Sequence, residues 1–107
     1  MTLKQKLILF LIGSDSGIKS IYGFVKYFDL ADFPGNVAKE IKVLIEHGLI
    51  KVSKWFDNGT ESDYAITEKG IKYISESFND NEILEYINQM PNPDFLFKLT
   101  KNLIKNK

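Results

Sequence analysis

A predicted helix at residues 34–47 carries polar side chains on the side turned away from its apolar face. These positions recur at spacings that place them together on one side of a helix. Amide and ammonium groups there can reach base edges in the major groove of DNA, and an apolar side chain can contact a thymine methyl. We expect base contacts from Asn36, Lys39 and Val43 and a phosphate contact from Lys42. A solvated or protein-binding face is the alternative interpretation.

Other donors lie where a nucleic-acid backbone could run. Lys19 and Ser20 fall in the first turn of a second predicted helix, and Lys51 and Lys54 lie on a predicted strand. Ammonium and hydroxyl groups of this kind donate to phosphate oxygens. We expect phosphate contacts from all four, although Lys19 and Ser20 fit simple solvent exposure equally well. The tip of the predicted hairpin consists of Asn58, Gly59 and Thr60.

The charge pattern argues against strong DNA binding. Fourteen basic residues balance fourteen acidic ones over 107 residues, and every base is a lysine. Arginine is the usual residue for bidentate reading of guanine, and lysine replaces it only in part. The segment 57–68 holds four acids and no base, and a tip of that sign is repelled by DNA. The second interpretation is therefore a protein-interaction module that does not bind DNA.

Enzymatic and metal chemistry have little support in the sequence. The chain has no cysteine and a single histidine, His47, without a recognisable catalytic partner. The loop 13–17 is rich in Gly and Ser but lacks the Gly-Lys-Ser/Thr step of a phosphate-binding loop. We expect no enzyme activity, no metal and no cofactor.

Local signals predict the elements that would hold these side chains. The third helix buries Val37, Ile41, Leu44 and Ile45, and Gly48 follows its last turn, where a helix cap needs a positive φ. Apolar and polar residues then alternate over 50–56 and again on the return strand, with an Asp-Asn-Gly turn between the two strands. Thr67 is a suitable N-cap for a fourth helix.

Two steps in this region resemble the MarR- and PadR-like winged helix-turn-helix regulators. They are Gly48-Leu49-Ile50, which leads into the wing, and Ile66-Thr67-Glu68-Lys69-Gly70, which leads out of it. The resemblance implies a mainly α fold with a two-stranded β-wing, as a winged helix-turn-helix domain plus C-terminal helices. It also implies a transcription regulator that binds double-stranded DNA with its third helix in the major groove. The related regulators often carry an Arg after the Asp of this turn, where this chain has Asn58.

The two ends of the chain favour a homodimer. The first predicted helix has apolar residues beyond one face, over 7–12, so it is either nearly surrounded or in contact with a second chain, which we favour. We expect a winged-helix domain at 1–79 and a helical extension at 80–107 that contributes to dimerisation; packing on the same domain is the alternative. Trp55, predicted to be partly exposed, and Phe95 and Phe97 are possible interface residues.

The compartment follows from what the sequence lacks. The apolar run at 7–12 is too short for a signal peptide and far from the length that spans a membrane. We expect a cytoplasmic protein with no membrane partner.

Overall fold

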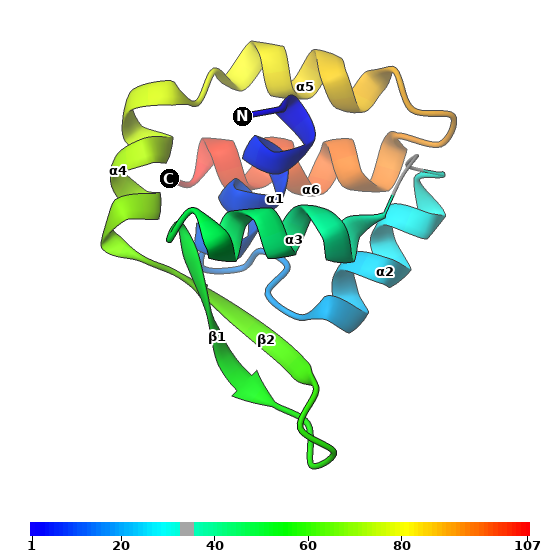
Figure 1. The fold of residues 1–107 in the computed structure, drawn as a ribbon. Coiled ribbons are helices and arrows are strands. Elements are labelled where there is room, and N and C mark those ends of the chain that lie inside the picture. Colours follow the sequence, from blue (N-terminus) through cyan, green and yellow to red (C-terminus); the bar gives the residue numbers. More distant parts are fainter. Residues whose placement is uncertain (33–35) are drawn as a thin grey trace.

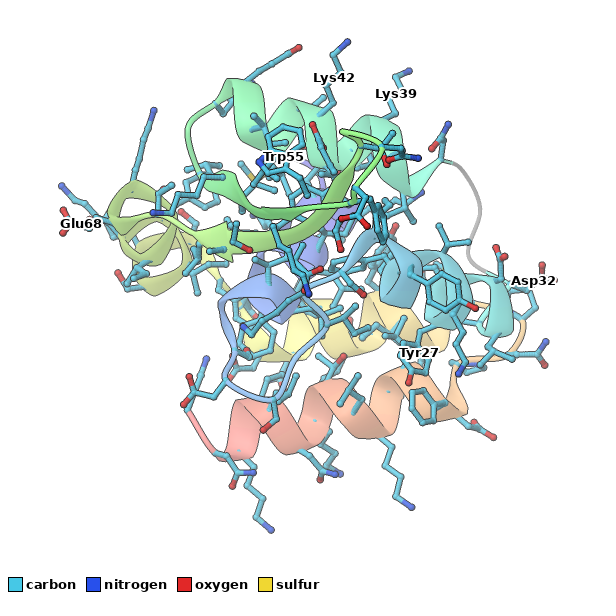
Figure 2. All side chains as sticks on the ribbon, turned by 90° about the horizontal axis from the view of Figure 1, so that it is seen from below. Tyr27, Asp32, Lys39, Lys42, Trp55 and Glu68 are labelled. Carbon is cyan, nitrogen blue, oxygen red and sulfur yellow. The ribbon has the colours of Figure 1, made fainter. Side chains whose placement is uncertain are left out.

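The computed structural model describes residues 1–32 and 36–107, and it is mainly helical with one two-stranded antiparallel sheet (Figure 1). The order of elements is α1 (Leu3–Gly13), α2 (Ile21–Leu30), α3 (Val37–Glu46), β1 (Ile50–Trp55), β2 (Glu61–Ile66), α4 (Glu68–Ser77), α5 (Asp80–Asn88) and α6 (Asp94–Lys105). The hairpin β1–β2 projects from the helical body, and α3 and α6 lie on opposite sides of that body (Figures 1 and 2). No helix in the described residues is long and apolar enough to cross a membrane.

Helix α1 is the centre of the hydrophobic core. Its residues 7–12 are each at most 4% exposed, because α3, α4, α5 and β2 all contact this helix. The expectation that part of this helix needs a second chain was wrong: the surplus apolar residues are covered by the chain's own elements. Thr2 begins the helix with a capping box, in which its hydroxyl accepts from the Gln5 amide and the Gln5 side chain accepts from the Thr2 amide.

Helices α2 and α3 begin later than the sequence suggested. Ser20 is the N-cap of α2, and its hydroxyl accepts a hydrogen bond from the Gly23 amide at 2.9 Å. Lys19 therefore precedes the helix instead of lying in its first turn. Asn36 caps α3 in the same way, and positions 34 and 35 of the predicted helix 34–47 lie outside the described residues.

The end of α3 is a Schellman motif, as the glycine predicted. Gly48 has φ of 72°, its amide donates to the Ile45 carbonyl at 2.9 Å, and the Leu49 amide donates to the Leu44 carbonyl at 3.0 Å. Leu44 and Leu49 are both buried. The reversal turns the chain directly from α3 into β1 and so sets the position of the hairpin against this helix.

The hairpin pairs Ile50 with Ile66 at its base and Trp55 with Glu61 near its tip, with an irregular register between Val52 and Trp55. The turn has Gly59 at φ of 86°. Close to the body, Ser20 forms an isolated antiparallel bridge with Asp63, and the Tyr64 amide donates to the Lys19 carbonyl at 2.8 Å. The segment before α2 thus lies beside β2 and anchors the hairpin to the helices.

The two sequence steps that flank the hairpin contact each other. The Thr67 hydroxyl donates to the Gly48 carbonyl at 2.6 Å, and the Thr67 amide donates to the Leu49 carbonyl at 3.1 Å. A Cβ on Gly70 would lie 2.2 Å from the Leu49 carbonyl oxygen, so only glycine allows this approach of α4 to β1. The predicted N-cap is confirmed: Thr67 also accepts from the Gly70 amide at 3.1 Å.

The C-terminal helices pack on the same core. Ile83 and Ile87 of α5 and Leu96 of α6 are 0% exposed and belong to one cluster with α1. Asn79 caps α5, and its side chain accepts from the Glu82 amide. The sequence left open whether these helices pack on a partner or on their own domain, and the structure shows the second. The apolar surface that favoured a homodimer is thus buried within one chain, and the homodimer stays a prediction.

Candidate functional site

The outer face of α3 presents two lysines to solvent. Lys39 and Lys42 are exposed and point away from the body of the protein (Figure 2). Val43, between them and the core, is only half-buried. This face therefore offers two ammonium groups and one partly accessible apolar side chain, with Glu46 as its exposed acid near the end of the helix.

Asn36 lies at the start of this face but already performs a structural task. Its side-chain oxygen accepts hydrogen bonds from the Ala38 amide at 2.9 Å and the Lys39 amide at 3.4 Å. The side-chain carbonyl is thus used to cap α3, and only the amide NH₂ is left to donate to another molecule. A bidentate contact to adenine, which needs both the donor and the acceptor of an asparagine, would require the cap to break.

Glu40 of α3 does not lie on this outer face. It is half-buried, and its Oε2 is buried with no hydrogen-bond partner among the described residues. Its charge acts on Lys4 and Tyr86: burial lowers the pKa of Lys4 while Glu40 opposes that shift, and burial and then Glu40 raise the pKa of Tyr86. The carboxylate therefore turns toward α1 and α5, which leaves the outer face of α3 more positive than its sequence suggested.

The side chains of Lys19 and Ser20 both make hydrogen bonds within the protein. The Lys19 ammonium donates to the carbonyls of Ile12 at 2.5 Å and Ser14 at 2.8 Å, at the C-terminal end of α1. A cation in this position suits the negative end of the helix dipole. The Ser20 hydroxyl caps α2. Both side chains thus hold the fold together, and a phosphate contact by either would cost these hydrogen bonds.

Lys51 and Lys54 remain available on the hairpin. Both are exposed on β1. At the tip, the Thr60 amide and hydroxyl donate to the Asn58 side-chain oxygen at 3.1 and 2.7 Å. The Asn58 amide NH₂ is therefore the donor that the tip still offers, since the Thr60 proton is used within the turn. Gly59 supplies the positive φ that this turn requires.

The acids of the hairpin are unequally exposed. Asp57 at the tip is exposed, whereas Glu61 and Asp63 are half-buried on β2. Glu61 accepts from the Tyr64 hydroxyl at 3.0 Å, and Asp63 accepts from the Ser62 hydroxyl at 2.5 Å. Burial raises the pKa of Tyr64, and so do its hydrogen bond to Glu61 and the charges of Glu61 and Asp63. The negative charge that opposes DNA thus lies at Asp57 and along β2, where Asp63 is the register partner of Lys54.

Exposed aromatic residues mark a second candidate surface. Trp55 is 56% exposed at the end of β1, as its place in the strand predicted, and Phe56 beside it is also exposed. Phe95 is exposed too, but its ring stacks on Tyr27 at 5.0 Å between centroids. Phe97 is partly buried against the core. The Lys101 ammonium lies 5.9 Å from the centroid of the Phe97 ring, so among the described residues Trp55 is the one of the three with neither a ring pair nor a cation at its ring.

The site residues predicted from sequence therefore divide into two groups. Lys39, Lys42, Lys51 and Lys54 are free on the surface of α3 and β1. Asn36, Lys19 and Ser20 are engaged in capping. A serine or asparagine just before an apolar helical pattern is a recognised N-cap signal, so two of these engagements were visible in the sequence. No local sequence pattern predicts the hydrogen bond of Lys19 to the Ile12 carbonyl, seven residues earlier.

The described residues contain no group of histidines, cysteines or carboxylates that could hold a metal ion. Comparison with known proteins finds no matching family, no matching curated protein and no matching solved structure.

Proposed function

We propose that the chain is a winged-helix DNA-binding protein of the transcription-regulator type, with α3 in the major groove and the β1–β2 hairpin as the wing. The observation that carries this proposal is the outward presentation of Lys39 and Lys42 on a helix that leads directly into an exposed hairpin (Figure 2). A helix is of a size to enter the major groove, and ammonium groups can reach guanine or phosphate there.

Four lysines make the contacts in this arrangement. Lys39 and Val43 meet base edges, Lys42 holds phosphate, and Lys51 and Lys54 follow the backbone from β1. Asn36 adds a single donor, its amide NH₂, because its oxygen caps the helix. Few phosphates are neutralised, and the acidic tip opposes approach, so the binding is weak, and it weakens further as salt is added.

Fluorescence anisotropy of a labelled generic duplex tests the proposal. At low salt the protein raises the anisotropy in a saturable way, and the change weakens as salt is added. Absence of binding at about 50 mM salt, where electrostatic contacts are strongest, would refute it.

A protein-interaction module is the second candidate, and one observation favours it. Trp55 and Phe56 are consecutive in sequence and both exposed, on a hairpin whose tip is acidic. Exposed tryptophan is typical of binding hot spots in protein interfaces. Under this function Trp55→Ala abolishes partner binding, and Lys39→Ala with Lys42→Ala leaves it unchanged.

A further inference from the structure

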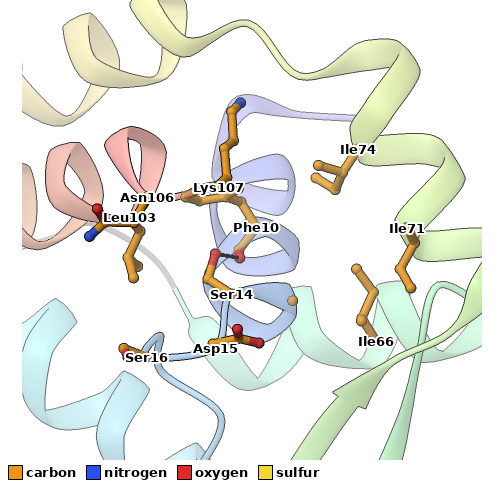
Figure 3. A pocket seen from close by; sticks show the side chains of 11 residues that line it. Phe10, Ser14, Asp15, Ser16, Ile66, Ile71, Ile74, Leu103, Asn106 and Lys107 are labelled. Carbon is orange, nitrogen blue, oxygen red and sulfur yellow. Dashed lines mark hydrogen bonds between the residues drawn. The ribbon is translucent and has the colours of Figure 1, made fainter.

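A cavity of about 430 Å³ opens between the C-terminal ends of α1 and α6 on one side and α4 on the other (Figure 3). Its apolar walls come from Phe10, Leu103, Ile66, Ile71 and Ile74. This volume lies within the range of about 300–1,000 Å³ typical of small-molecule sites. Apolar walls with few polar groups at the rim are the usual composition of such a site.

The polar groups at the rim are not equally free. Lys107 is paired with Asp80 at 2.8 Å, and its ammonium lies 5.0 Å from the centroid of the Phe78 ring. Its positive charge is therefore already balanced. Asp15 also lines the cavity, is exposed, and makes no hydrogen bond or ion pair within the described residues.

A second acceptor lies beside Asp15. The Ser14 hydroxyl donates its proton to the Phe10 carbonyl at 2.8 Å, the bond drawn in Figure 3. Its oxygen can then only accept from a further group. The cavity rim thus presents a free carboxylate and a hydroxyl acceptor next to an apolar chamber.

We propose that this cavity binds a small amphipathic amine, with its apolar body between Phe10, Leu103 and the three isoleucines and its ammonium at Asp15. A cation is attracted by the unpaired carboxylate of Asp15, whereas an anion is repelled by it. Lys107 offers an anion little compensation, because its charge is paired with Asp80. An ammonium is donor-only and matches the acceptors Asp15 and Ser14, while Ser16 and Asn106, which also line the cavity, can each accept or donate.

Occupancy of the cavity would act on the hairpin. Ile66 is the last residue of β2, and Ile71 and Ile74 belong to α4, which follows directly. A ligand that packs against these three side chains braces the base of the hairpin against α1 and α6. Amine binding does not depend on DNA binding, because it is measured by titrating the protein with the amine in the absence of DNA.

The test uses 2-phenylethylamine as the probe, with 2-phenylethanol and 3-phenylpropanoate as neutral and anionic analogues of similar shape. Methyl-resolved NMR spectra of the isoleucines are recorded during titration of the whole chain. The amine shifts the Ile66, Ile71 and Ile74 signals in a saturable way, the alcohol binds more weakly, and the anion binds weakest.

Two variants and a control complete the design. Asp15→Asn weakens amine binding about fivefold, as expected for one solvent-exposed ion pair, and leaves alcohol binding unchanged. Asp57→Asn removes the same charge at the hairpin tip and has no effect. Ile71→Trp fills the mouth of the cavity from an exposed position and blocks all three compounds without loss of the folded NMR spectrum.

If the isoleucine signals do not shift at the highest soluble concentration of the amine, the proposal is overturned. Equal affinity for the amine and the anion, or an amine affinity that is the same in Asp15→Asn and the unmodified chain, would overturn the assignment of the ligand as a cation.

Discussion

Removing two lysines from α3 should change the salt dependence of DNA binding by a calculable amount. The free lysines on the proposed interface are Lys39, Lys42, Lys51 and Lys54. Lys39 is assigned to base edges; if each of the other three neutralises one phosphate, the slope of log K against log salt is about −2.7. The affinity then falls about 40-fold between about 50 and 200 mM salt.

The variant Lys39→Ala, Lys42→Ala removes one of the three phosphate contacts, together with the base contact of Lys39. Its slope is about −1.8, and the same increase in salt lowers the affinity only about 12-fold. Both side chains are exposed, so their truncation leaves the core intact. Fluorescence anisotropy at four or more salt concentrations measures each slope, and a urea transition measured for each variant verifies that the fold is unchanged.

The control changes the same charge on the opposite side of the molecule. Lys98→Ala, Lys101→Ala removes two exposed lysines from α6, which lies across the body from α3 (Figure 2). The control keeps the original slope. Equal slopes for the α3 variant and the unmodified chain, or a loss of slope in the α6 variant as large as in the α3 variant, would refute the placement of DNA at α3.

Three further predictions concern the structure that supports this surface. Gly70→Ala should destabilise the fold by about 1–3 kcal/mol in urea unfolding, because the new Cβ would lie 2.2 Å from the Leu49 carbonyl oxygen; an unchanged midpoint would contradict this packing. Lys19→Met should cost about 1–3 kcal/mol, since two carbonyls at the end of α1 lose a charged donor, while the salt slope of DNA binding stays the same; a reduced slope would instead place Lys19 on phosphate. Burial and the Glu61 hydrogen bond raise the pKa of Tyr64 above its ordinary value of 10.0, so the folded state retains the tyrosine proton more strongly than the unfolded state. The resulting stability is present below about pH 10 and is lost as the pH rises above it, and Tyr64→Phe should lessen that loss in thermal unfolding curves measured between pH 9 and 12.

The elements of the fold were largely predictable because their signals are local. The Gly48 cap, the Thr67 N-cap and the Asp-Asn-Gly turn each depend on the backbone conformation of a few adjacent residues. The apolar periodicity of 37–45 likewise predicted the buried face of α3. The errors at helix starts have the same local origin: a serine or asparagine was placed inside the first turn when it caps the helix from outside.

The sequence by itself thus determined where the helices and strands form, which lysines are fixed on the outer side of α3 and β1, and that the chain offers no cysteine chemistry. Only the tertiary structure decided that α1 is surrounded by its own chain, that Lys19 caps the end of α1 and that Glu40 turns inward. It alone assembled the cavity from residues of α1, β2, α4 and α6. The physical reason is that capping and periodicity act between neighbours along the chain, whereas burial and charge pairing depend on distances between segments that only the packed fold brings together.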